Sequence, residues 1–410
     1  MNAEQSDEEW EKAERIYKEL LHEEACLWYI SDSYGSKVMV KIPSASIKAL
    51  IAGCRIEFLF GKDNKEKPTK FHAGVRVYDD PIHYLSVTGI HRFLDEHISL
   101  ERIMNRTQTY IHFHNELNVC TATASLSFDT KDQLKVLNFI GNPNNLYIGD
   151  FDSHASRSLD CFQYSLTKHE DLKNVYEIET LVVQGKLESW QMMENHFIGL
   201  NEANKIVLNN TDEGGTFEQQ VWASLESLFE KQLHKNPRIP FKNGTRELTD
   251  LFAYSEYGIF LIETKALGIL GASNERTMDR KVAGLQKQIE KAIDQLTGAV
   301  KKIREDSPVL DNKGNEILFD RKLLPHCIIL VSELLPFGEW QHIVYKMMVA
   351  MVEAKIYLHL VDLREFMRYV GMARGSVNRL DYYLMKRAEQ FTEHQTVHIK
   401  VKEVFEKDDK

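Results

Sequence analysis

A segment near the middle of the chain, residues 247–265, constrains the fold more than any other. Two runs rich in aliphatic and aromatic residues flank residues 255–258, whose sequence Ser-Glu-Tyr-Gly has the composition of a tight turn. Such runs, separated by a turn that contains glycine, predict a β-hairpin. If Tyr254 pairs with Ile259 across the turn, the register of the whole hairpin is set.

This register has a consequence for three charged residues. Continuing the pairing outward places Asp250 directly opposite Glu263. Opposed residues share a face of the sheet with Cβ atoms about 5 Å apart, where like charges repel. Alternation along the strand puts Lys265 on the same face as Glu263. We therefore expect a cation between the two carboxylates, although the trio is also consistent with a buried ion-pair network in which Lys265 neutralises one of them.

The same residues resemble the core motif of a nuclease superfamily. Asp250 together with Glu-x-Lys at 263–265 resembles the PD-(D/E)xK, or restriction-endonuclease-like, pattern, and residues 258–266 (GIFLIETKA) are similar to the NERD and Mrr-like branches. The family proline before the acid is replaced here by Thr249. The resemblance covers about residues 214–372. It implies an α/β (α+β) fold, with a mixed sheet flanked by helices.

The resemblance also implies a reaction and a set of residue roles. It implies hydrolysis of phosphodiester bonds, with Asp250, Glu263 and Lys265 as catalytic residues. Asp250, Glu263 and the carbonyl group of Thr264 would bind Mg²⁺, a hard cation that prefers oxygen ligands, with Mn²⁺ as an alternative ion. DNA is expected as the substrate rather than RNA, and restriction or phage defence as the role. The alternative is a catalytically silent copy of the fold that serves as a binding or assembly module.

A helix before the hairpin offers one more candidate carboxylate. Residues 216–219 have the capping-box form, which predicts a helix with Thr216 as its N-cap. Glu218 then leans toward the apolar side of this helix, and the resemblance implies a catalytic and metal-supporting role for it. A carboxylate in a first turn also stabilises the helix dipole, and both interpretations of Glu218 stay open.

A helix after the hairpin offers a candidate glutamine. Residues 278–304 carry an apolar stripe with helical spacing, and Gln288 and Gln295 lie along one border of that stripe. The resemblance implies a catalytic glutamine on this helix that reaches the metal or the scissile phosphate. We prefer Gln288, since Gln295 is better explained as part of a solvated helix edge.

The distribution of charge bears on the partner. The formal net charge of −10 argues against a generic nucleic-acid coat protein, which needs a basic face. Residues 231–246, however, contain no acid and lead directly into the hairpin. We expect Arg238, Lys242 and Arg246, with Lys281, to bind nucleic acid, and a solvated loop is the alternative for the basic run.

The length of 410 residues predicts two domains. Residues 1–200 are expected to form a β-rich domain of no recognised family, used for regulation, recognition or oligomerisation, so that a homo-oligomer is expected. A polar segment, 201–215, reads as a linker, 216–400 as the nuclease-like domain and 401–410 as a polar tail. The elements predicted in the first domain are strands at 38–42, 55–60, 74–78 and 110–114 and helices at 7–25 and 91–104.

Location is predicted from three features of the sequence. No apolar run approaches the roughly 20 residues that span a membrane, and the acidic N-terminus does not resemble a signal peptide. The five cysteines are scattered, without a CxxC spacing, which favours a reducing compartment. We therefore expect a cytoplasmic protein with no membrane partner.

Two polar clusters in the first domain resemble metal sites. His112 and His114 share a face of a predicted strand, while Asp150, Asp152 and His154 lie within five residues of each other. Packing or surface positions are the more frequent explanation for a strand histidine pair, and the second cluster has the composition of an Asx-rich turn. We expect structural roles for both.

Overall fold

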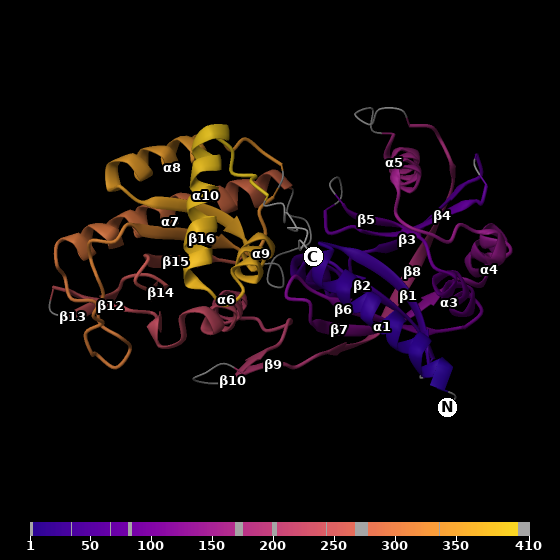
Figure 1. Cartoon of the computed structure of the whole chain (residues 1–410), viewed down its shortest axis with the longest axis horizontal. Coiled ribbons are helices and arrows are strands. Elements are labelled where there is room, and N and C mark those ends of the chain that lie inside the picture. The colour runs from indigo at the N-terminus through magenta and orange to yellow at the C-terminus, as the bar shows by residue number, and fades with distance from the viewer. Residues whose placement is uncertain are drawn as a thin grey trace, which may run out of the picture. The chain divides into compact units, whose positions relative to one another are not determined.

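The structure, a computed structural model, describes residues 3–33, 35–65, 67–80, 84–168, 175–198, 203–242, 244–266, 278–335 and 337–400 (Figure 1). The chain divides into two compact units. The first contains residues 1–195 and 207–209, and the second contains residues 196–206 and 210–410. The predicted tail at 401–410 lies outside the described residues.

The N-terminal unit is built on one large sheet. In its described part, eight strands pair in the order β1-β2-β6-β7-β8-β3-β4-β5. All neighbours are antiparallel except β2 and β6, which run parallel. The strands are β1 (Cys26–Asp32), β2 (Gly35–Lys41), β3 (Ile56–Asp63), β4 (Lys70–Val77), β5 (Leu85–His91), β6 (Thr109–His114), β7 (Cys120–Phe128) and β8 (Glu179–Met192).

Helices pack around this sheet and close its core. They are α1 (Ala3–His22), α2 (Ser44–Ile51), α3 (Leu94–Met104), α4 (Thr130–Ile140) and α5 (Ser153–Thr167), with a short 3₁₀ turn at Pro143–Asn145. Phe58, Phe71 and Phe113 are fully buried between them. The four predicted strands are confirmed as β2, β3, β4 and β6. The helix predicted at 91–104 begins only at Leu94, because β5 extends to His91.

The C-terminal unit contains the mixed sheet that the sequence predicts. Its five described strands are ordered β11-β14-β15-β16-β17. Pairing is antiparallel from β11 to β15 and parallel from β15 to β17. The strands are β11 (Leu233–Lys235), β14 (Leu251–Tyr254), β15 (Ile259–Lys265), β16 (Pro325–Val331) and β17 (Tyr357–Asp362). Every residue of β16 is buried, as expected of a central strand with an unbroken apolar sequence.

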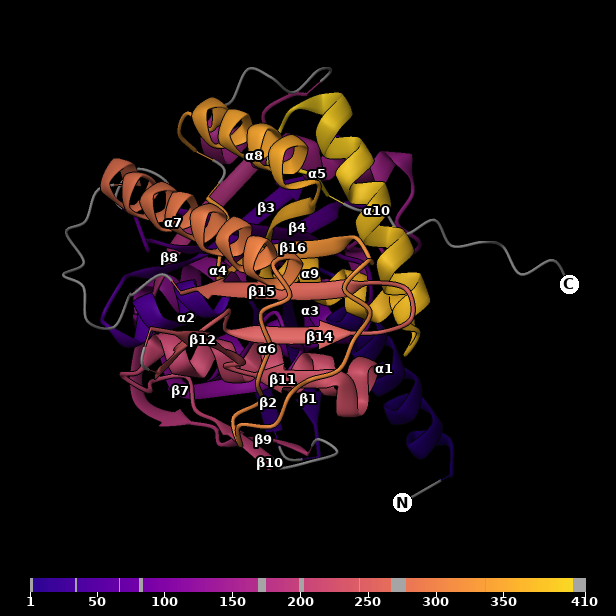
Figure 2. The same ribbon diagram turned by 90° about the vertical axis from the view of Figure 1, so that its left-hand side faces the viewer.

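Helices cover both faces of this sheet, which completes the α/β architecture (Figure 2). One face packs on α7 (Met278–Arg304) and α8 (Gln341–Ala354), whose apolar residues share a core with Leu261 and Ile329. The other face contacts α6 (Glu213–Phe229) through the ring pair Phe229–Phe260. The remaining helices are α9 (Leu363–Ala373) and α10 (Val377–His394). Two small hairpins, β9 (Asn195–Ile198) with β10 (Ala203–Ile206) and β12 (Arg238–Phe241) with β13 (Gly244–Glu247), and a 3₁₀ turn at Glu230–Gln232 complete the unit.

The start of α6 differs from the prediction, whereas α7 has the predicted bounds. Helix α6 begins at Glu213, inside the segment predicted as a linker, and its N-cap is Asp212 rather than Thr216. The Asp212 side chain accepts a hydrogen bond from the main-chain N–H of Gly215 at 2.9 Å. The two glycines of the first turn resemble a linker in sequence, but this aspartate satisfies the free N–H group and allows the helix to begin earlier.

Candidate active site

The hairpin has the predicted register. Tyr254 pairs with Ile259 and Leu251 with Ile262, so Asp250 and Glu263 are the next opposed positions. The turn is closed by a hydrogen bond from the Ser255 N–H to the Gly258 carbonyl at 2.9 Å. Because register fixes which residues share a face, the pairing of β14 with β15 is the one expected from the sequence, and a joint role for the two acids stays a prediction.

Glu263 is a buried carboxylate with a lysine partner. It is only 1 % exposed, and its Oε2 accepts a hydrogen bond from the Lys265 Nζ at 2.8 Å. Burial raises the pKa of Glu263 above its ordinary value, the Asp250 charge raises it further, and the Lys265 ammonium opposes both. At the end of β15, Glu263 is therefore bonded to the Lys265 amine and influenced by the charge of Asp250.

Asp250 is tied to the neighbouring strand by its side chain. Its Oδ2 accepts hydrogen bonds from the Thr264 N–H at 2.6 Å and from the Thr264 hydroxyl at 2.8 Å. The preceding residue, Thr249, is buried and donates its hydroxyl to the Ile262 carbonyl at 2.8 Å. Thr249 thus anchors the strand at the position of the family proline. Thr264 holds Asp250 through its amide and hydroxyl, and coordination by its carbonyl group stays a prediction.

Glu218 reaches the same place from α6. Lys235 on β11 lies 3.8 Å from its Oε1. With its amide nitrogen turned toward the acceptors, the Asn236 side chain donates to Glu218 Oε1 at 3.1 Å and to the Asp250 main-chain oxygen at 3.0 Å. Burial is the main cause of the raised pKa of Glu218, and the Asp250 charge adds to it. Asn236 therefore bridges the two acids that come from α6 and the hairpin.

A further carboxylate, Glu247, was not predicted as part of the site. It ends β13, and although the residue as a whole is exposed, burial of its carboxyl group raises its pKa. The charges of Asp250 and Glu218 and a hydrogen bond with the Asp250 carboxyl raise this pKa further. Its place three residues before Asp250 was the available signal in the sequence.

Among the described residues, four carboxylates thus influence one another here: Glu218, Glu247, Asp250 and Glu263. Carboxylate oxygens are the donors that Mg²⁺ and Mn²⁺ prefer, so the chemistry of the set fits a divalent ion. No group of three or more His, Cys, Asp or Glu in the described chain is already arranged around a metal position. In the structure Asp250 accepts from Thr264, and Glu263 accepts from Lys265.

The predicted glutamine lies apart from these contacts. Gln288 and Gln295 are both exposed on α7, and Gln288 makes no side-chain hydrogen bond within the described residues. Lys281, in the first turns of the same helix, is half-buried. No hydrogen bond of the described residues joins Gln288 to the four carboxylates, and its catalytic role stays a prediction.

Three of the four predicted nucleic-acid-binding residues, Arg238, Lys242 and Arg246, lie on the β12–β13 hairpin. Arg238 pairs with Glu247 across the two strands, and its guanidinium donates to the Thr245 hydroxyl at 2.7 Å. Lys242 and Arg246 both lie against the ring of Phe241. The basic run is therefore a strand pair next to the carboxylates rather than an irregular loop.

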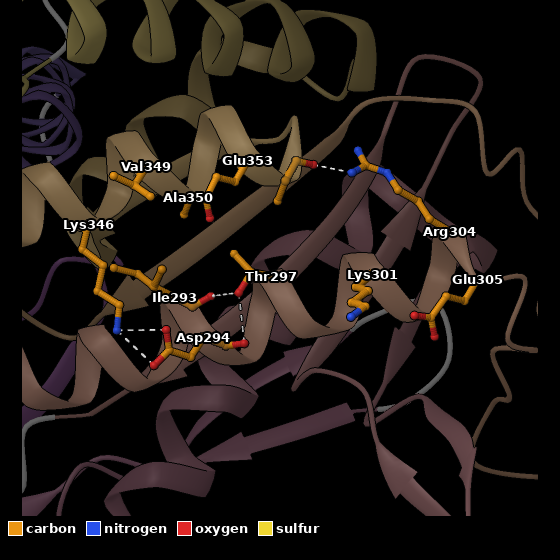
Figure 3. Close-up of a pocket in the computed structure, with 11 residues that line it drawn as sticks. Ile293, Asp294, Thr297, Lys301, Arg304, Glu305, Lys346, Val349, Ala350 and Glu353 are labelled. Atoms are coloured by element: carbon orange, nitrogen blue, oxygen red, sulfur yellow. Dashed lines mark hydrogen bonds and ion pairs between the residues drawn. The ribbon is translucent and has the colours of Figure 1, made fainter.

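A cavity of about 580 Å³ lies elsewhere, between α7 and α8 (Figure 3). Its lining includes cations and acids that already have partners. Lys346 Nζ lies 2.9 Å from Asp294 Oδ1, and the Arg304 guanidinium donates to the carbonyl groups of Ala354 and Lys355. None of the four carboxylates lines this cavity, so it is separate from the candidate active site.

The two polar clusters of the N-terminal unit have structural explanations. Asp152 is the N-cap of α5, where its side chain accepts from the Ala155 N–H at 2.8 Å. The main-chain oxygen of Asp150 accepts from a tyrosine hydroxyl. On β6, burial lowers the pKa of His112, and lowers that of His114 to about 4. Among described residues, neither cluster forms a metal-binding group.

Comparison with known proteins identifies part of the second unit. Residues 213–329 match the family model of NERD, the nuclease-related domain. The match runs from the first residue of α6 into β16 and includes all four carboxylates and Lys265, consistent with a PD-(D/E)xK-like nuclease branch. Searches of curated proteins and of solved structures returned no match. None of the described helices has both the length and the apolar character needed to cross a membrane.

Proposed function

We propose that the nuclease-related domain of this chain hydrolyses phosphodiester bonds in DNA with Mg²⁺ as its cofactor, in restriction or phage defence. The observation that carries the proposal is the hairpin register, which opposes Asp250 and Glu263 and leaves the Lys265 ammonium 2.8 Å from Glu263. Acids and an amine in this arrangement are the parts that metal-assisted hydrolysis needs.

The metal ligands we propose are Asp250, Glu263 and Glu218, with the Thr264 carbonyl group. Support comes from electrostatics, because Asp250 raises the pKa of both Glu263 and Glu218. Such groups repel one another when charged, and a divalent ion between them removes the repulsion. When bound, the ion would supply Lewis-acid polarisation of the scissile phosphate. Mn²⁺ would serve in place of Mg²⁺ because it takes the same oxygen ligands.

The side chains of the domain have separate roles in this proposal. The Lys265 ammonium orients the attacking water and stabilises the negative charge that grows on the phosphate oxygens as the water oxygen bonds to phosphorus. Glu263 positions that amine through their 2.8 Å contact. Asn236 keeps Glu218 and Asp250 at a fixed separation by bonding to both. Arg238, Lys242, Arg246 and Lys281 hold the phosphate backbone, and Gln288 would approach it only in the complex.

The second candidate is a silent nuclease-fold module that binds or assembles without cleavage. One observation favours it: Asp250 and Glu263 already have internal partners, Thr264 and Lys265. In that case Asp250, Glu263 and Lys265 form a structural ion-pair network.

For both candidate functions we propose that the protein is cytoplasmic and that the N-terminal unit provides regulation, recognition or oligomerisation.

A plasmid-nicking assay distinguishes the two candidates. Wild type is incubated with supercoiled DNA and Mg²⁺, with EDTA as the metal-free reference, beside Lys265→Ala. The matched control is Lys386→Ala, which removes an equally short ion pair, to Glu389 at 2.7 Å, from the exposed surface of α10. We expect Mg²⁺-dependent nicking that Lys265→Ala abolishes and Lys386→Ala leaves intact. Equal activity in all three proteins, or activity in none, would contradict the proposal, and an RNA substrate of the same sequence tests the preference for DNA.

A further inference from the structure

The β12–β13 hairpin, labelled in Figure 1, has an aromatic residue, Phe241, as the last residue of β12. Ile239 and Phe241 are two residues apart on one strand and therefore share a face. Ile239 is 1 % exposed and belongs to the domain core, whereas Phe241 is 44 % exposed. Ile239 thus anchors the hairpin in the core, while Phe241 lies beyond the edge of the core. Gly244, opposite Phe241, has no side chain to cover the ring.

Two cations accompany the exposed ring. Lys242 Nζ lies 5.3 Å from the Phe241 ring centroid, and the Arg246 guanidinium carbon lies 5.0 Å from it. Contacts at this distance are attractive but weak at exposed sites. A flat ligand that stacks on the Phe241 ring would displace Lys242 and Arg246 from the ring, but both cations would stay next to the ligand. They could then contact negatively charged groups of that ligand.

The hairpin continues directly into the candidate active site. Asp250 follows Arg246 by four positions in the sequence, so their Cα atoms are at most about 14 Å apart. On the other face of the hairpin, Arg238 pairs with Glu247, which contacts the Asp250 carboxyl group. A ligand held at Phe241 and Arg246 therefore lies within a short chain length of the carboxylates.

We infer that this hairpin, residues 238–247, is a binding arm for single-stranded nucleic acid, on which an unpaired base stacks against Phe241 while Lys242 and Arg246 contact the flanking phosphates. The inference rests on the proposed function and specifies its substrate class. Cations alone attract duplex and single strand alike. A ring offers stacking only to a base whose flat face is free, and this contact tolerates any base.

Fluorescence anisotropy in EDTA tests the arm without cleavage. Full-length protein is titrated into a labelled oligothymidylate of about 16 nucleotides, the upper site size of a single-strand-binding fold, and into a duplex of equal length. The variants are Phe241→Ala, Phe241→Trp and Arg246→Ala. Tyr382→Ala is the matched control, since Tyr382 is 50 % exposed on α10 with Lys386 Nζ 5.8 Å from its ring.

We expect Phe241→Ala to weaken single-strand binding by about tenfold and duplex binding by less than about twofold, because phosphate contacts carry the latter. Phe241→Trp should keep the affinity, and its added tryptophan emission should be quenched by the single strand, which also reports on a folded arm. Arg246→Ala should weaken binding to both forms and make it less dependent on salt. Tyr382→Ala should bind as wild type does.

Three results overturn the inference: no effect of Phe241→Ala on the single strand, an equal effect on both forms, or an unquenched Phe241→Trp. Failure of the arm and failure of the proposed function are distinguishable. If wild type nicks plasmid with Mg²⁺ while Phe241 variants bind normally, only the arm is wrong. If wild type neither binds nor cleaves nucleic acid, both are wrong.

Discussion

Removing the lysine from the Lys265–Glu263 pair should destabilise the C-terminal unit strongly. At the 2.8 Å that separates Lys265 Nζ from Glu263 Oε2, two unit charges attract by about 6 kcal/mol at an effective dielectric of 20. Loss of one partner from a buried pair costs about 3–5 kcal/mol. The Lys265 side chain is 18 % exposed and Glu263 can take up a proton, so we expect Lys265→Met to lower the free energy of unfolding by about 2–3 kcal/mol.

Calorimetry of the full chain measures this loss. For a unit of this size each kcal/mol lowers the melting temperature by about 2–4 °C, so one transition should move down by about 4–12 °C. Adding Glu263→Gln should recover most of the loss, because no buried charge then lacks a partner. Lys386→Met, which opens an exposed pair screened by solvent, should shift the transition much less than Lys265→Met does.

Two results would refute the electrostatic reasoning. The first is a shift for Lys265→Met no larger than that for Lys386→Met, because the buried pair would then behave like a surface pair. The second is a double variant, Lys265→Met with Glu263→Gln, that is as unstable as the two single losses added together. Additivity would mean that the two side chains do not interact in the folded protein.

Three further predictions concern the metal, the bridge and the N-terminal unit. Mg²⁺ should raise the melting temperature of wild type but not of Asp250→Asn, whose amide oxygen still accepts from Thr264; an identical rise in both proteins would remove this site from consideration. Asn236 has a φ of +49°, and its side chain bonds to the Glu218 carboxylate and to the Asp250 main-chain oxygen. Asn236→Ala should therefore lower the free energy of unfolding in urea by about 1–2 kcal/mol, and Asn236→Gly by less, because glycine adopts a positive φ without strain. Equal losses in the two variants would argue against backbone strain at this residue. Burial lowers the pKa of His72 to about 3 and that of His97 to about 4. As the pH falls below about 6.5, the unfolded chain takes up protons on these histidines and the folded unit does not. Each histidine should therefore lower the free energy of unfolding by up to about 1.4 kcal/mol for each pH unit of acidification. A dependence of stability on pH between about pH 6.5 and 5 that is unchanged in His72→Asn would contradict this burial.

The parts of the site that sequence analysis predicted are those with strong local periodicity. Alternation and a tight turn determine the register of residues 250–265, and an apolar stripe determines α7. Glu247 and Asn236 were missed for a physical reason. The strand before Asn236 has only three residues, too few to show a period, and Glu247 ends an exposed strand. Their convergence on Asp250 depends on tertiary contacts.

The N-terminal unit shows a different limit of prediction. Half of the residues of the strand β8 are exposed and only Val183 and Gly185 are buried, and the sequence analysis predicts no strand there. It nevertheless pairs with both β7 and β3 and joins the two halves of the sheet. Such pairing between distant segments is decided by the packing of the whole core, which no local pattern contains.

The central claim is that Asp250 and Glu263 hold a divalent ion beside Lys265. The most direct test is a crystal structure of the full chain grown with Mn²⁺, with the ion located by its anomalous scattering. We predict a peak between the two carboxylates, at about 2.0–2.3 Å from their oxygens, with the Lys265 ammonium displaced from Glu263, and no peak in Asp250→Asn. A site still held by the Thr264 and Lys265 contacts, with no ion at saturating Mn²⁺, would contradict the account.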